Sequence, residues 1–138
     1  MQTIREVMTR DVRVVSPDQT IREAATAMAD GDIGSLPVGE DDRLVGMITD
    51  RDIAIRAVAE GRDPTTSVRD VMTDRIQYCY DDENVQEIAR NMAELGVRRL
   101  PVVNREKRLV GIVALSNIAS CSDNRSKQTL LDGVAQPH

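Results

Sequence analysis

One short stretch of the chain has residue types and a spacing that can bind a phosphorylated sugar. Gly46, Thr49 and Asp52 are spaced three residues apart. They lie at the point where an apolar strand pattern ends and a helix pattern begins. A helix N-terminus presents unpaired N–H groups and the positive end of the helix dipole, so it attracts phosphate, and Thr49 adds a hydroxyl donor there. The carboxylate of Asp52, in the first turn, can accept hydrogen bonds from both hydroxyls of a ribose. Phosphate at the helix end and ribose on Asp52 together describe a nucleotide.

The same residues also fit a purely structural role. Thr-x-x-Asp is close to the capping box, in which the hydroxyl of the cap residue and the acid three residues later satisfy each other's backbone N–H groups. A cap of this kind would start a helix without any ligand. From Thr49 and Asp52 alone, a nucleotide site and a helix cap both remain open.

Arg98 and Arg99 are a second candidate for ligand chemistry. They directly precede an apolar strand pattern, and side chains alternate along a strand, so one of the two should face the core side or a cleft. A guanidinium near a cleft can neutralise a phosphate. The alternative is a solvated strand end, with salt bridges to Glu94 or Glu106.

The sequence has few residues in a pattern that could support catalysis or bind a metal ion. The only histidine is His138, the last residue of the sequence, so no Ser–His–Asp or Cys–His arrangement can be built around a folded histidine. No Cys-x-x-Cys or His-x-x-His spacing suits zinc, and most of the paired carboxylates fall in turns, where Asp is expected for backbone reasons. We therefore expect no enzyme activity, no catalytic residues, no metal site and no cofactor.

The elements that must position these residues come from an internal repeat. Three segments of the first half return in the second at a spacing of 64 or 65 residues: Val7-Met8-Thr9 as Val71-Met72-Thr73, Leu36-Pro37-Val38 as Leu100-Pro101-Val102, and Leu44-Val45-Gly46 as Leu109-Val110-Gly111. The extra residue falls in a charged turn, where loops tolerate insertions. The phrase after the last segment is not kept, because Ala114 replaces Thr49 and Asn117 replaces Asp52. We expect one nucleotide site per chain, centred on Thr49 and Asp52.

Each copy has the pattern of a β-α-β-β-α unit, which places the chain in the α/β class, as an α+β fold. We expect strands over residues 12–15, 33–38 and 44–48 and over 76–79, 97–103 and 109–113, with helices starting near 18, 50, 82 and 116. The apolar stripes of the first helix in each copy are Ile21, Ala24, Ala25 and Met28, and Val85, Ile88, Ala89 and Met92. The copies span residues 1–63 and 64–122, and a tail covers 123–138. Each half is small, so we expect the two to share a core.

Composition excludes several classes of partner. The net charge is −5 and the chain has neither Trp nor Phe, so it lacks the basic face and the stacking platforms of a nucleic-acid-binding protein. An acidic chain is also repelled by an anionic membrane surface. The sequence has no long apolar run, and we expect a cytoplasmic protein. Cys79 and Cys121 form no disulfide framework and are interpreted as idle thiols.

The duplicated pattern resembles a tandem pair of cystathionine-β-synthase (CBS) domains, also called a Bateman module, and looks most like the stand-alone bacterial members. The resemblance covers about residues 3–120, and its motifs lie in these segments: 7–9, 33–38 and 44–53 in the first copy, and 71–73, 97–103 and 109–113 in the second. It implies two repeats related by pseudo-two-fold symmetry. It also implies a regulatory module that senses AMP, ADP, ATP or a related ligand such as S-adenosylmethionine or NAD in the cleft between the repeats.

The resemblance also implies roles for individual residues. Gly46, Thr49 and Asp52 match the family motif Gly-x-x-Thr/Ser-x-x-Asp, with Thr49 on phosphate and Asp52 on ribose. The implied base pocket is formed by residues around Val14, Val15, Ile33 and Leu36. Our further candidate contacts are Asp50 and Arg51, which lie within the motif, and Arg98 and Arg99 of the second copy.

Partners follow from the resemblance and from two apolar positions. Many family members dimerise through their helices, and Ile55 and Ala27 both fall off the expected core faces, which indicates a homodimer surface. An effector protein of unknown identity would respond to ligand binding. The alternative function is a non-catalytic dimerisation or interaction module in which Thr49-x-x-Asp52 is only a helix cap. Nucleic-acid binding through Arg98 and Arg99 is a third possibility, and the charge count disfavours it.

Overall fold

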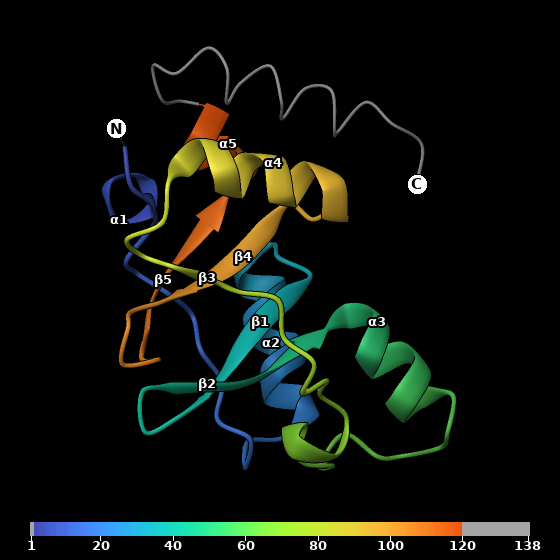
Figure 1. Cartoon of the computed structure of the whole chain (residues 1–138). Coiled ribbons are helices and arrows are strands. Elements are labelled where there is room, and N and C mark those ends of the chain that lie inside the picture. Colours follow the sequence, from blue (N-terminus) through green and yellow to red (C-terminus); the bar gives the residue numbers. More distant parts are fainter. Residues whose placement is uncertain (1, 120–138) are drawn as a thin grey trace. The chain divides into compact units, whose positions relative to one another are not determined.

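The computed structural model describes residues 2–119 (Figure 1). The predicted tail 123–138 and Cys121 lie outside the described residues. The chain divides into two compact units, one of residues 13–76 and one that joins the residues up to 12 with those from 77 onward. None of the helices within residues 2–119 has the length and apolar character needed to cross a membrane.

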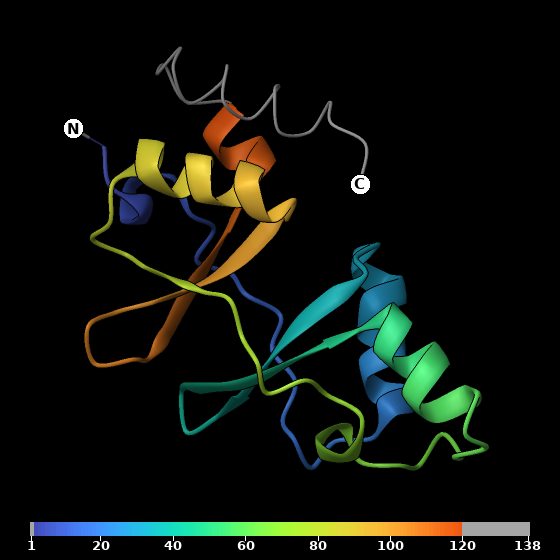
Figure 2. The same ribbon diagram turned by 45° about the vertical axis from the view of Figure 1, so that its right-hand side comes forward.

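The unit of residues 13–76 is built around a β-hairpin. Its elements are α2 (Ile21–Gly31), β1 (Ser35–Glu40), β2 (Arg43–Thr49), α3 (Asp50–Asp52), a π-helical continuation (Ile53–Val58) and a 3-10 turn (Val68–Asp70). β1 and β2 are antiparallel, and Ser35 lies opposite Thr49. Their turn places Asp41 and Asp42 at positive φ, which Asp tolerates better than most residues. Figure 2 shows α2 and the helical segment after β2 on the same side of the hairpin.

The second unit repeats this plan with one more strand. Its elements are α1 (Ile4–Val7), β3 (Cys79–Tyr80), α4 (Val85–Leu95), β4 (Arg99–Val103), β5 (Leu109–Ala114) and α5 (Leu115–Ala119). β3 is parallel to β4, and β4 is antiparallel to β5. The first unit has the equivalent of β3 only as a single parallel bridge from Val15 to Val38. A mixed fold of helices and sheets, as the sequence predicts, is therefore confirmed.

The two copies exchange their N-terminal segments. Thr9, at the start of the first copy, forms an antiparallel bridge to Ile112 on β5 of the second copy. Thr73, near the start of the second copy, forms the equivalent antiparallel bridge to Met47 on β2 of the first copy. The compact units are therefore divided near residues 12 and 76, whereas the sequence copies are predicted to divide at 63.

The buried residues follow this exchange and form two clusters, one in each unit, and each cluster contains side chains from both halves of the sequence. Ile4 and Met8 pack into the cluster of the second unit, together with residues of β3, α4, β4, β5 and α5. Val68 and Val71 pack into the cluster of the first unit with residues of α2, β1 and β2. Each cluster thus depends on side chains that lie far away in sequence.

Several element boundaries differ from the sequence predictions. The predicted strands over residues 12–15 and 76–79 are shorter in the structure. The first is a single bridge at Val15 and the second is Cys79–Tyr80, and each pairs with only one neighbouring strand. The helices begin at Ile21 and Val85 rather than near 18 and 82, because Thr20 and Asn84 are their N-caps. In α2 Ala25 is exposed, and Ala27 packs against the core instead. Ala27 therefore does not support a homodimer surface.

Cys79 is an inert thiol in this fold. It is free and 1 % exposed in β3. Burial raises the pKa of its thiol to about 12, and the carboxylates of Glu83 and Asp81 act in the same direction. Burial therefore favours the protonated form of the Cys79 thiol in the folded chain, which agrees with the idle role expected from the sequence.

We expect this burial to appear in both reactivity and stability. In a Cys121→Ser chain, Cys79 should react with a disulfide reagent at pH 8 at least about 100-fold more slowly when folded than in denaturant, because thiolate is the reacting form. Since the folded pKa lies above the unfolded value of about 8.5, the stability contribution is complete below about pH 8.5 and falls as pH rises towards 12. Equal labelling rates in the two states would contradict the assignment.

Candidate ligand-binding site

The predicted motif lies at the junction of β2 and α3. Thr49 is the last residue of β2 and the N-cap of α3. The N–H of Asp52 donates to Thr49 Oγ1 over 3.0 Å, and the N–H of Thr49 donates to Asp52 Oδ2 over 3.0 Å. Both side chains are half-buried. The capping box that the sequence leaves open as an alternative is therefore formed.

The other backbone donors of this junction are also occupied. Asp50 N–H donates to the carbonyl of Gly34 over 2.9 Å, and Arg51 N–H donates to Asp50 Oδ1 over 2.8 Å. The N–H of Ile53 donates to the carbonyl of Asp50. The N–H groups that we assigned to a phosphate from the sequence are thus already bonded within the chain. The Thr49 hydroxyl oxygen accepts the cap hydrogen bond, so its hydroxyl hydrogen can still be donated to a ligand.

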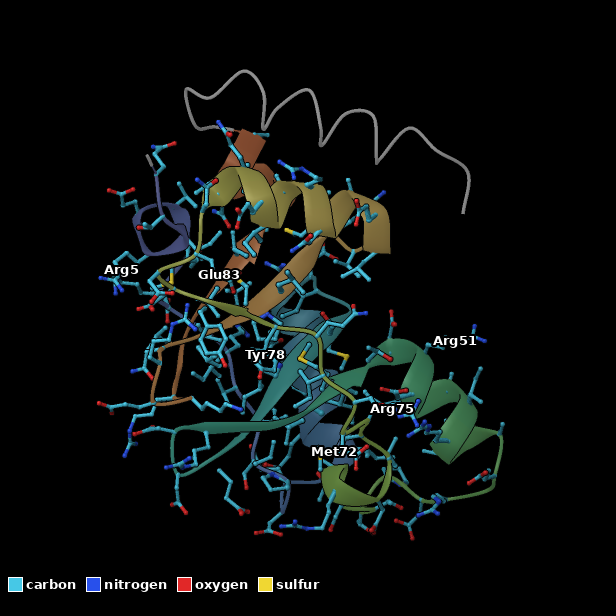
Figure 3. All side chains as sticks on the ribbon, in the orientation of Figure 1. Arg5, Arg51, Met72, Arg75, Tyr78 and Glu83 are labelled. Carbon is cyan, nitrogen blue, oxygen red and sulfur yellow. The ribbon has the colours of Figure 1, made fainter. Side chains whose placement is uncertain are left out.

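Two carboxylates with spare acceptor capacity stand at the same place. Asp52 uses one oxygen in the cap, so Oδ1 keeps its lone pairs for other donors. Asp50 is exposed, and its Oδ2 lies 3.0 Å from the position that a Cβ on Gly34 would occupy. Arg51 is exposed and its side chain points away from the junction (Figure 3). This end of the helix therefore offers acceptors more than donors.

The predicted base-contact residues divide into two groups. Leu36 is 0 % exposed and Val15 4 % exposed, so their side chains belong to the core and can support a ligand only from behind. Val14 is 43 % exposed and Ile33 is half-buried. Contact of Val14 and Ile33 with a ligand stays a prediction.

The altered phrase of the second copy keeps half of the cap. Asn117 Oδ1 accepts a hydrogen bond from the N–H of Ala114 over 2.8 Å, the same bond that Asp52 makes with Thr49. Asn117 Nδ2 also lies 3.5 Å from Thr9 Oγ1. An amide is thus sufficient for the backbone bond, and the cap alone does not require the negative charge of Asp52.

Arg98 and Arg99 lie beside the equivalent junction of the second unit. Both are exposed, Arg99 pairs with Ala114 across β4 and β5, and the carbonyl of Arg98 accepts from the N–H of Leu115. Within residues 2–119 neither guanidinium forms an ion pair, and Glu106 pairs with Arg108 instead. The expected salt bridges to Glu94 or Glu106 are therefore not formed. Proximity of these arginines to Thr49 stays a prediction, because they belong to the other compact unit.

Gly34 belongs to the site, although it was not among the residues predicted from the sequence. Its carbonyl accepts from Asp50, and its missing side chain leaves room for the Asp50 carboxylate. The repeat contained the signal, because Gly34 aligns with Arg98 and Asp50 with Leu115. In the part of the chain that the structure describes, no three His, Cys, Asp or Glu side chains are placed to hold a metal ion.

Both copies of the repeat match a known domain family. The model of the CBS domain matches residues 4–58 and again 68–123. The chain belongs to the CBS domain family. The CBS domain-containing protein YhcV of Bacillus subtilis is 43 % identical over 119 residues, which cover 86 % of this chain and 84 % of YhcV. The two predicted copies are thus the two repeats of a CBS pair.

Solved structures of other CBS pairs share the fold. Hypoxic Response Protein I with two coordinated zinc ions has a TM-score of 0.75 at 44 % identity, with coverage of 86 % of this CBS pair and 98 % of that chain. CBSX2 in complex with AMP has a TM-score of 0.74 at 28 % identity, with coverage of 85 % and 93 %. The CBS domain pair of MJ0100, in complex with 5′-methylthioadenosine and S-adenosyl-L-methionine, has a TM-score of 0.71 at 28 % identity, with coverage of 86 % and 94 %.

Proposed function

We propose that this CBS pair is a non-catalytic regulatory module that binds an adenine nucleotide or a related adenosyl ligand at Thr49 and Asp52. The observation that carries the proposal is the spare carboxylate oxygen of half-buried Asp52 beside the Thr49 hydroxyl. A carboxylate can accept both hydroxyls of a ribose in charge-assisted bonds. Complexes of similar CBS pairs with AMP, 5′-methylthioadenosine and S-adenosyl-L-methionine support an adenosyl ligand here.

Further parts of the proposal concern assembly and location. The site would lie in a cleft between the repeats, with Arg98 and Arg99 as contacts from the second repeat. A homodimer would form through the helical segment 53–58, on which Ile55 is 48 % and Val58 70 % exposed. Two exposed apolar side chains on one short segment are the kind of surface that a protein partner covers. Ligand binding in the cytoplasm would then be transmitted to an effector protein.

The rival function is a protein-interaction module without a ligand. It is favoured by the closed capping box, in which Thr49 and Asp52 already satisfy each other's backbone N–H groups. On this view Asp52 contributes to stability alone. Loss of such a cap costs about 0.5–2 kcal/mol.

Two substitutions of Asp52 separate the functions. Asp52→Asn should keep the cap, because Asn117 makes the equivalent bond, and should change the free energy of unfolding by less than about 0.5 kcal/mol. It should still weaken ligand binding by about tenfold, because a hydrogen bond to a charged group is worth roughly 1.5 kcal/mol more than a neutral one. Asp52→Ala should lose both the cap and the ligand.

The measurement is the melting temperature of each chain with AMP, ADP, ATP, NAD, S-adenosylmethionine and 5′-methylthioadenosine. A ligand that binds the folded state raises it in proportion to the logarithm of ligand excess. If no compound raises the melting temperature of the wild type, or if Asp52→Asn responds as the wild type does, the ligand site is refuted and the cap function stands.

A further inference from the structure

We propose that Arg56 is a positioning residue that couples ligand binding at the Thr49–Asp52 site to the exchanged segment 71–73, through which the chain continues into the other unit. The inference rests on the proposed function and deepens it, because it names the path along which occupancy of the site is passed on. It follows from hydrogen bonds and packing on both sides of the site, all within the unit of residues 13–76.

The first hold on segment 71–73 comes from β2, directly before the site. Met47 and Thr73 exchange two backbone hydrogen bonds, each over 2.9 Å. Gly46 is buried, and a Cβ there would lie 2.7 Å from Met72 Sδ and 2.9 Å from the carbonyl oxygen of Thr73. The first glycine of the motif therefore leaves the space in which the Met72 thioether packs, so displacement of the end of β2 displaces the segment as well.

The second hold comes from the helical segment directly after the site. Arg56 Nη1 donates to the carbonyl of Met72 over 3.1 Å and to the carbonyl of Val71 over 3.5 Å. Hydrogen bonds from a charged donor are stronger than those between neutral groups. The acceptors belong to residues that pack into the core of this unit, since Val71 is buried and Met72 is half-buried against the same cluster. Elements on both sides of the site thus hold one segment.

The helical segment that carries Arg56 has an unusual winding. Ile53–Val58 is π-helical, and the N–H of Ala59 donates to the carbonyl of Ala54, five residues earlier, over 2.9 Å. Such turns are rare and frequently lie at functional sites. Arg56 lies within this stretch, so its position against segment 71–73 is set by the winding that follows the site.

The second copy shows which hold accompanies the ligand motif. It keeps the first hold, because Gly111 leaves the same space for Met8. At the position of Arg56 it has Cys121 in its sequence, so it lacks the side chain for the second hold. The glycine therefore serves the exchange of segments in both copies, whereas the arginine occurs only in the copy that has the Thr-x-x-Asp motif.

A ligand can couple to the segment without a large change of shape. A ligand bound to Thr49 and Asp52 would restrict the motion of β2 relative to the helical segment that carries Arg56. Conformational entropy lost on ligand binding is not lost again when both elements hold segment 71–73, so the two events favour each other. Residues 74–78 lead from this segment to β3 of the other unit, and occupancy is thereby passed along the chain.

Amide hydrogen exchange followed by NMR tests the coupling on the full chain, with AMP and 5′-methylthioadenosine each added to saturation. The reporter is the N–H of Thr73, which donates to the carbonyl of Met47, and amides of α2 in the same unit report general stabilisation by a ligand. In the wild type, the bound compound should slow exchange at Thr73 at least about fivefold more than in α2, the lower end of typical coupling between sites. In Arg56→Met this extra slowing should fall below about twofold.

Two further variants separate the role of Arg56 from its charge and from folding. Arg62→Met removes the same charge from an exposed side chain, which pairs with Glu60 over 3.5 Å, and should respond as the wild type does. Arg56→Lys keeps a charged donor and should restore part of the extra slowing at Thr73. A purely structural role for Arg56 would change exchange in the ligand-free chain but leave the effect of the ligand intact.

The outcomes distinguish this inference from the function beneath it. If a compound binds and Arg56→Met shows the same extra slowing at Thr73 as the wild type, or if the wild type shows none, the coupling is wrong while the adenosyl site stands. An Arg56→Met chain that no longer binds either compound would place Arg56 in the ligand site and overturn its positioning role. If neither compound binds the wild type, the inference fails together with the proposed function.

Discussion

Replacing Ile4 by alanine should destabilise the unit formed by the second copy, although Ile4 belongs to the first copy in sequence. Ile4 is 0 % exposed and packs with Met92, Leu100 and Ile118 in the cluster of the second unit. Removal of a buried isoleucine side chain beyond Cβ costs about 2–5 kcal/mol, because it loses transfer free energy and leaves a cavity. For a domain of this size that is a large part of the total stability.

Hydrogen exchange with mass spectrometry locates the effect. In Ile4→Ala, amides of α4 should lose protection more than amides of α2, since only the second unit contains Ile4. The reciprocal change Val68→Ala should do the opposite, because Val68 packs into the first unit. Leu95→Ala is the matched control, as Leu95 lies on α4 but is 50 % exposed. Equal loss of protection in both units for Ile4→Ala would contradict the exchange of segments.

The parts of the fold that the sequence predicts well are those that local periodicity encodes. All four residues of the stripe Val85, Ile88, Ala89 and Met92 are buried in α4, because a period of 3.6 residues places them on one face. The hairpins are also found where alternating apolar residues flank a charged turn. Such patterns depend on neighbours within a few residues, so a single sequence is enough to recognise them.

The exchange of the Val-Met-Thr segments could not be predicted in this way. Thr9 and Thr73 have the same local sequence context, and nothing in either segment records which strand it will bridge. Pairing of Thr9 with β5, more than 100 residues later, depends on tertiary packing that periodicity does not report. For the same reason the expected boundary at residue 63 follows the repeat, whereas the compact units do not.

The candidate site shows a similar division. The positions of Thr49 and Asp52 at a strand-to-helix junction could be predicted, since Thr-x-x-Asp is a local signal. Which donors remain free could not, because the N–H of Asp50 donates to the carbonyl of Gly34, which lies sixteen residues earlier, directly before β1. Only the three-dimensional structure shows that the N–H groups of Asp50, Arg51 and Asp52 are already bonded within the chain.

Gly111→Ala should cost about 2–3 kcal/mol of unfolding free energy, and the reason lies in the exchanged segment. A Cβ on Gly111 would lie 2.7 Å from Met8 Sδ and 2.8 Å from the carbonyl oxygen of Thr9. The sulfur could shift by a rotamer change, but Thr9 is fixed by two backbone hydrogen bonds with Ile112, over 2.8 and 2.9 Å. The added methyl group must therefore push the segment off β5 or strain the strand.

Chemical denaturation of Gly111→Ala beside Gly31→Ala tests this account. Gly31 ends α2, and a Cβ there would meet its neighbours at 3.4 Å or more, in ordinary contact. Gly31→Ala should therefore be neutral or stabilise by up to about 1 kcal/mol through reduced entropy of the unfolded chain. Met8→Ala combined with Gly111→Ala should recover little, since the Thr9 carbonyl remains in place. Full recovery in that double variant would show that the sulfur alone causes the clash and that the bridge between Thr9 and Ile112 is free to move.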